Sequence, residues 1–180
     1  MATIKRRGSV VRVQLRPEER AILAGLAGEV TQMLGGATAP DPDPLAAMVG
    51  MDDDLPEQPN APEDPAVQRL LPDAYGDAEA AAEFRRLTDA ELRRGKTGGL
   101  TNLAADVHGE GGAIDLSVDR ADEWLAAIND IRLVLGVRLD IDDDEGGWRI
   151  GLGHDDPRQP LLAAYDWLSM LQELIVDALY

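Results

Sequence analysis

Residues 113–136 read AIDLSVDRADEWLAAINDIRLVLG and contain the clearest structural signals in the chain. The first part alternates apolar Ile114 and Leu116 with polar Asp115 and Ser117. Since successive side chains of a strand point to opposite faces, this alternation predicts a short strand with one buried face.

A helix is predicted directly after this strand. Ser117 is a preferred N-cap residue, and Asp119 lies in the first turn, where the helix dipole favours an acid. Apolar residues then recur at steps of three and four, which predicts one buried helix face. These residues are Trp124, Ala127, Ile128, Ile131 and Leu135. Gly136 is predicted to end the helix.

A second strand and two further helices are indicated by similar signals. Apolar and polar residues alternate over residues 9–15, which predicts a strand with one solvent-exposed face. Helices are predicted to begin at Pro17 and Pro160. We expect the strands near 9–15 and 113–117 to pair, because a lone strand leaves its backbone groups unsatisfied. The predicted fold is therefore α+β and predominantly helical, a helical bundle with a small two-stranded sheet.

The middle of the chain is predicted to be helical with interruptions. Asp64 and Asp77 are candidate N-caps. Each glycine in a helix interior costs about 1 kcal/mol, so the pair Gly98 and Gly99 favours a break. Beyond the predicted helix end at Gly136, residues 137–141 are expected to form a short extended piece.

The domain organisation is predicted from two changes in composition. Residues 36–63 are acidic and rich in proline, which is typical of a flexible insertion, and residues 140–159 form an acidic, glycine-rich loop. The remaining segments are short enough to share one core, so we expect a single domain over residues 1–180.

Composition narrows the function classes. The chain has 34 acidic residues against 17 lysines and arginines, a net charge of -17, which disfavours a general nucleic-acid binder. It has no cysteine, which excludes disulfides and thiolate sites within these 180 residues. No apolar run reaches the roughly 20 residues that span a bilayer, so we expect a cytoplasmic protein without membrane contact.

The residues that usually carry catalysis are few and scattered. The two histidines, His108 and His154, lie among glycines and acids, and none of the three serines lies in a nucleophile motif. Two histidines without cysteine cannot assemble a zinc site of three or four such ligands. We therefore predict no catalytic, metal or cofactor site, and no enzyme.

Polar and aromatic residues on the predicted helices are the candidate contacts for a partner. The set consists of Trp124, Asn129, Asp130, Arg132, Arg85, Arg86, Arg93, Arg94, Tyr165 and Trp167. A solvated helix face is the alternative. In it Asp130 or Arg132 is tied to a neighbouring helix, and Arg86, Arg93 and Arg94 pair with Glu83 and Glu91.

Four blocks of sequence resemble a known family. They are Arg69-Leu70-Leu71-Pro72, AAAEFRRLTDAELRR from Ala80 to Arg94, WLAAINDIRLVLG from Trp124 to Gly136, and YDWLSMLQE from Tyr165 to Glu173. With them the chain resembles the actinobacterial AosR family of oxidative-stress transcriptional regulators, formerly a family of unknown function.

The resemblance implies a cytoplasmic regulator that acts with an alternative sigma factor of RNA polymerase and is triggered by cysteine oxidation. Because this chain has no cysteine, the trigger is not expected to carry over. The family is also often encoded beside the adaptor of the Clp protease, which hints at a link to proteolysis.

Three hypotheses for the function follow. The first is a regulator that contacts a sigma factor or RNA polymerase, without a cysteine redox switch. The second is direct binding of promoter DNA through Lys5, Arg6 and Arg7 together with the basic cluster from Arg85 to Lys96. The third is a dimeric scaffold or an adaptor linked to the Clp protease, and a homodimer is compatible with each.

Overall fold

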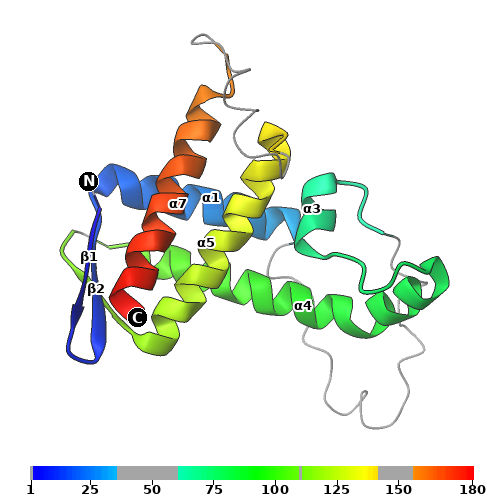
Figure 1. Cartoon of the computed structure of the whole chain (residues 1–180), viewed down its shortest axis with the longest axis horizontal. Coiled ribbons are helices and arrows are strands. Elements are labelled where there is room, and N and C mark those ends of the chain that lie inside the picture. Colours follow the sequence, from blue (N-terminus) through cyan, green and yellow to red (C-terminus); the bar gives the residue numbers. More distant parts are fainter. Residues whose placement is uncertain (1, 36–60, 110, 142–155) are drawn as a thin grey trace.

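The computed structural model describes residues 2–35, 61–109, 111–141 and 156–180, and it is predominantly helical with a small sheet (Figure 1). The predicted flexible insertion and glycine-rich loop fall largely outside these residues. In chain order the elements are β1 (Thr3–Arg7), β2 (Val10–Gln14), α1 (Pro17–Met33), α3 (Pro65–Leu70), α4 (Ala78–Val107), β3 (Ile114–Ser117), α5 (Val118–Leu139) and α7 (Gln159–Leu179). The α+β class is confirmed.

The sheet has three antiparallel strands in the order β1-β2-β3. The expected pairing of β2 with β3 is present, with Val11 opposite Leu116 and Val13 opposite Ile114. The prediction of two strands was incomplete, since β1 adds a third and places Ile4 opposite Val13. The buried side chains of the sheet face the helices, chiefly α5 and α7.

Several helices begin where the sequence predicts. The side chains of Asp64, Asp77 and Ser117 each accept a hydrogen bond from a backbone N–H in the first turn of α3, α4 and α5, respectively. In α1 the backbone N–H of Arg16 donates to Glu19 Oε2 at 2.8 Å. These bonds satisfy donors that a helix end otherwise leaves unpaired.

Two predicted interruptions are wrong. Helix α4 runs without a break through Gly98 and Gly99, because Leu100 and Leu103, just beyond them, are fully buried. Burying one leucine gives about 1.5–3 kcal/mol, which outweighs about 1 kcal/mol for each glycine. Residues 137–139 are helical as well: α5 continues past Gly136 to Leu139, and the C-cap residue Asp140 has a left-handed φ of 58°.

Helix α5 lies at the centre of the molecule. It packs against α7 and α3 and also contacts α4 and α1, as its position in Figure 1 shows. Trp124, Ile128 and Ile131 are at most 1% exposed, as the three-and-four spacing predicts. The described helices include none with both the length and the hydrophobicity needed to cross a membrane.

Candidate protein-interaction site

A groove between α5 and α7 is lined by three of the predicted contact residues, Asn129, Arg132 and Tyr165. It consists of two adjoining hollows, of about 380 and 460 Å³, that share Asn129 and Arg132. We call it the α5–α7 groove. The first hollow is lined by Arg69, Asn129, Arg132, Leu133, Gly136, Val137, Asp140, Ile141 and Tyr165, and the second by Leu125, Asn129, Arg132, Ser169, Gln172, Glu173, Val176 and Asp177.

Arg132 lies where the two hollows meet and is held by neutral groups. Its guanidinium carbon is 5.0 Å from the ring centroid of Tyr165, and its Nη2 donates to the Tyr165 hydroxyl at 3.3 Å. Its Nη1 donates to Gln172 Oε1, while its Nε is buried and has no hydrogen-bond partner among the described residues. Within the described part of the chain, no carboxylate pairs with Arg132. An incoming acidic group therefore meets a positioned guanidinium whose charge is not neutralised.

Packing of the two helices fixes the orientation of these side chains. Gln172 donates through Nε2 to the backbone carbonyl of Leu125 at 3.2 Å, which directs its Oε1 toward Arg132. The hydroxyl of Ser169 donates to the carbonyl of Tyr165 at 2.8 Å. Asn129, exposed on α5 next to buried Ile128, forms part of the wall. Hydrogen bonds within the protein thus fix the side chains that line the groove.

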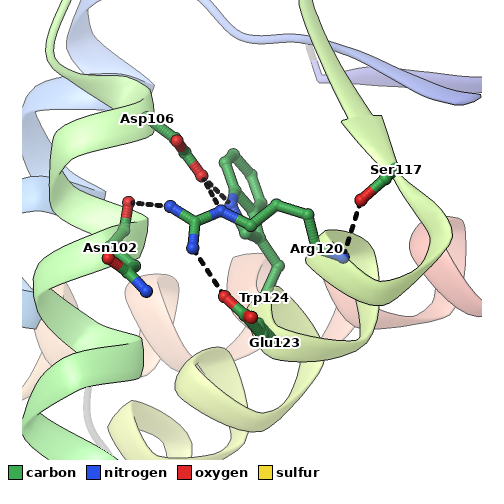
Figure 2. A network of polar contacts seen from close by, with 6 residues as sticks. All are labelled: Asn102, Asp106, Ser117, Arg120, Glu123 and Trp124. Atoms are coloured by element: carbon green, nitrogen blue, oxygen red, sulfur yellow. Dashed lines mark hydrogen bonds and ion pairs between the residues drawn. The ribbon is translucent and has the colours of Figure 1, made fainter.

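A second arginine on α5 has the opposite surroundings (Figure 2). Arg120 Nε donates to Asp106 Oδ2 at 2.7 Å, its Nη1 donates to Glu123 Oε2 at 2.5 Å, and its Nη2 donates to the Asn102 carbonyl at 3.1 Å. Trp124 Nε1 donates to the same Asp106 oxygen at 2.9 Å. Burial raises the pKa of Asp106, but the bonds from Arg120 and Trp124 outweigh it and the pKa is lowered. This network joins α5 to α4.

The structure brings together three of the predicted contact residues, Asn129, Arg132 and Tyr165, in the α5–α7 groove. Trp124 is only 1% exposed, so in this fold it belongs to the core and a partner cannot reach it. Trp167 is half-buried and lies outside the groove lining.

Asp130 also points away from the groove and serves a structural contact. Its side chain is buried and accepts a hydrogen bond from Lys96 Nζ of α4 at 2.7 Å. Burial raises the pKa of Asp130, and the hydrogen bond and charge of Lys96 only partly oppose this effect. Asp130 and Arg132 are thus each tied to a neighbouring helix, as the alternative prediction proposed.

The arginines of α4 lie outside the groove, and the predicted pairing of Arg86, Arg93 and Arg94 with Glu83 and Glu91 is wrong within the described residues. Arg93 Nε pairs instead with Asp89 at 2.6 Å, and Arg85 pairs with Asp73. Arg93 also donates to the Leu34 carbonyl at 3.2 Å. The prediction considered only the spacing of residues along one helix, whereas the observed partners also depend on the packing of other segments against α4. Arg86 and Arg94 are exposed.

The N-terminal basic residues lie on β1. Arg6 donates to the carbonyl of Leu179 at 2.5 Å and so ties the strand to the end of α7, while Lys5 and Arg7 are exposed. Strand β1 and the N-terminal half of α4 lie at opposite ends of the molecule (Figure 1). The two predicted basic clusters therefore do not form one continuous surface within the described residues.

Sequence reasoning named only three of the residues that line the groove, and Gln172 and Arg69 are among those that it missed. Gln172 is seven residues after Tyr165 and thus on the same face of α7, a spacing that was available as a signal. Arg69 comes from α3, and only the tertiary arrangement places it there. The described residues include no group of three or more histidine, aspartate or glutamate side chains that is arranged to hold a metal ion.

The fold and the groove define a class of protein, a predominantly helical α+β domain with a surface groove between two helices. The chain belongs to the family described as a domain of unknown function (DUF2017), whose sequence model matches residues 1–179. The predicted resemblance to AosR proteins is confirmed by named relatives.

These relatives are similar over most of their length. Oxidative stress regulator AosR of Mycobacterium tuberculosis (strain ATCC 25618 / H37Rv) is 32% identical over 186 residues, which cover 95% of this chain and 83% of the relative. The putative oxidative stress regulator AosR of Mycobacterium leprae (strain TN) is 32% identical over 187 residues, which cover 96% of this chain and 83% of the relative. No solved structure matches the chain at a significant level.

Proposed function

We propose that this protein is a cytoplasmic regulator of the oxidative-stress response that acts by binding another protein in the α5–α7 groove. The partner is a sigma factor or RNA polymerase. The printed names of the relatives support the regulatory role. The groove supports action by contact, because its positioned side chains can bind a partner and suggest no reaction.

The single observation that carries the proposal is Arg132. In a chain with 34 acidic and 17 basic residues, its guanidinium is held by Tyr165 and Gln172 and pairs with no carboxylate of the described residues. An arginine of this kind is suited to bind a carboxylate of a partner in two-pronged geometry. We infer that the bound segment supplies that carboxylate.

The two ends of the groove differ in charge, which orients the segment. Arg132 lines both hollows. The first hollow also contains one base, Arg69, and one acid, Asp140, whereas the second contains two acids, Glu173 and Asp177, beside apolar Leu125. A bound segment with an acidic residue in the first hollow and a basic residue in the second would complement these charges. The overall negative charge of the chain speeds the approach of a partner with a basic surface, such as a DNA-binding sigma factor.

Pull-down of purified sigma factors and core RNA polymerase by the immobilised protein tests the proposal. We expect one of them to form a complex that weakens as salt is raised, because exposed charges are screened. The matched variants are Arg132→Gln and Arg120→Gln, since both remove one arginine from α5. Absence of a complex with every sigma factor and with the polymerase, or equal retention by both variants, would contradict the proposal.

Regulation in this chain does not use a thiol. With no cysteine among its 180 residues, the protein offers no disulfide or sulfenic acid. We expect the thiol-specific oxidant diamide to leave its affinity for the partner unchanged when the protein alone is treated. A change in affinity after this treatment would show that another group senses the oxidant.

A further inference from the structure

The N-terminal half of α4 is a helical arm with few buried side chains. Before Thr97, the only buried residue of the helix is Ala81, and Figure 1 shows this end of α4 far from the sheet. Its inner side is anchored by the Arg85–Asp73 ion pair and by the edge-to-face contact of Phe84 with Tyr75, whose centroids are 5.7 Å apart. The opposite side of the arm is exposed.

The exposed side contains a stripe of four residues, Glu83, Leu87, Ala90 and Arg94. Their spacing of four, three and four residues places them on one helix face. Leu87, at 66% exposed, is the most exposed large aliphatic side chain among the described residues. Within the described residues, neither Glu83 nor Arg94 forms an ion pair. The stripe is thus an apolar centre between two unpaired opposite charges.

The order of these four residues lets the stripe pair with an antiparallel second copy of itself. Glu83 and Arg94 lie equally far from the midpoint of the stripe, on opposite sides of it, and so do Leu87 and Ala90. A two-fold axis through the midpoint, perpendicular to the helix, brings a second stripe alongside in the antiparallel direction. Each Glu83 then faces Arg94 of the second copy, and each Leu87 faces Ala90 of the second copy.

We propose that this stripe, which is separate from the α5–α7 groove, binds a second copy of the chain through an antiparallel pair of α4 helices. In such an isologous contact one surface serves both subunits, so its charges must complement themselves. Two ion pairs then flank a central apolar contact, and the small side chain of Ala90 lets the helices approach closely. A parallel arrangement would place like charges together at both ends and is disfavoured.

The size of the contact sets its strength. The stripe spans three helical turns, about 16 Å, and a contact from one helix per subunit lies below the area typical of permanent dimers. We therefore expect a reversible dimer with a dissociation constant of roughly 10–100 μM, which weakens at high salt.

Sedimentation of the full chain over a concentration series tests this dimer by charge reversal. The wild type is expected to shift from monomer to dimer, whereas Glu83→Arg and Arg94→Glu each place like charges in contact and stay monomeric. The double variant E83R/R94E restores opposite charges and the wild-type net charge, so it is expected to dimerise again.

Two controls separate the specific contact from other effects. Asp122→Arg on α5 and Arg7→Glu on β1 make the same net-charge changes at exposed positions outside the stripe, and both are expected to dimerise. Thermal unfolding confirms that each variant is folded, since exposed substitutions change stability by only about 0.5 kcal/mol. A wild type that stays monomeric at millimolar concentration, single variants that dimerise like the wild type, or a double variant that stays monomeric would overturn the proposal.

Discussion

Two arginines of α5, twelve positions apart, have opposite surroundings. Arg120 donates to the carboxylates of Asp106 and Glu123, so its charge is used inside the protein. Arg132 rests on the Tyr165 ring and donates to Gln172, which are both neutral. The same side chain on the same helix thus serves two purposes. Both arginines join α5 to a neighbouring helix, but only the carboxylate partners of Arg120 neutralise the charge of the guanidinium.

The difference also separates two functions of α5 along its length. Near its beginning, the helix carries Trp124, which is 1% exposed and hydrogen-bonded to Asp106 of α4. Farther along the same helix, Asn129 and Arg132 line the groove between α5 and α7. We therefore expect substitutions at the first part to change stability and substitutions at the second part to change partner binding.

Trp124→Ala tests the structural role of the first part of α5 and has the largest expected effect. Removing a fully buried aromatic side chain leaves a cavity, so the free energy of unfolding should fall by about 3–5 kcal/mol. Urea unfolding followed by circular dichroism measures the loss. The matched variant Trp124→Phe fills most of the space and loses mainly the bond to Asp106, about 1 kcal/mol. A loss below about 1 kcal/mol for the alanine variant would show that the site is not part of the core.

Arg132→Gln tests the part of α5 that lines the groove and has the next largest expected effect. Partner affinity should fall about 30-fold, or about 2 kcal/mol, because a partner carboxylate loses its guanidinium. The free energy of unfolding should change by less than about 1 kcal/mol, since Arg132 has only neutral partners. Arg120→Gln should give the reverse pattern, a lower stability with partner binding retained. Titration of the partner by calorimetry compares the two, and equal losses of affinity would remove the distinction.

Asp106→Asn sharpens the comparison through its dependence on pH. The pKa of Asp106 is lowered because the bonds from Arg120 and Trp124 outweigh burial, so the ionised form stabilises the fold. This contribution is present above the ordinary pKa of about 4 and is lost as the pH falls through the lowered value. The wild type should therefore exceed the variant in stability at pH 7, and the gap should narrow on acidification.

Urea unfolding of both proteins from pH 7 down to about pH 3 measures that gap. A gap that stays constant, or that widens as the pH falls, would mean that the Asp106 carboxylate does not carry the stabilisation.

Local signals predicted the fold best where they agreed with the packing. The spacing of apolar residues after Ser117 predicted the buried face of α5, and the alternation of β2 and β3 predicted their pairing. Strand β1 was missed because it buries only Ile4, too little to create an alternating pattern. The helix across Gly98 was missed because its stability comes from tertiary contacts, which a local glycine penalty does not include.

The groove was predictable only in part. Asn129, Arg132 and Tyr165 stood out as polar or aromatic residues beside apolar helix faces. No sequence pattern shows that Arg120 finds a carboxylate on α4 while Arg132 finds an amide on α7, because these partners are 14 and 40 residues away. The distinction between a structural and an available arginine is therefore a tertiary property.

The most direct test compares both arginines in one spectrum. The Nε–Hε signals of the ¹⁵N-labelled protein are recorded before and after addition of the sigma factor or polymerase subunit selected by pull-down, and Arg132→Gln assigns the relevant signal. The account predicts that the Arg132 signal shifts on binding, since its Nε has no partner in the described part of the free chain, while the Arg120 signal stays in place. A bound partner that leaves the Arg132 signal unchanged would contradict the account.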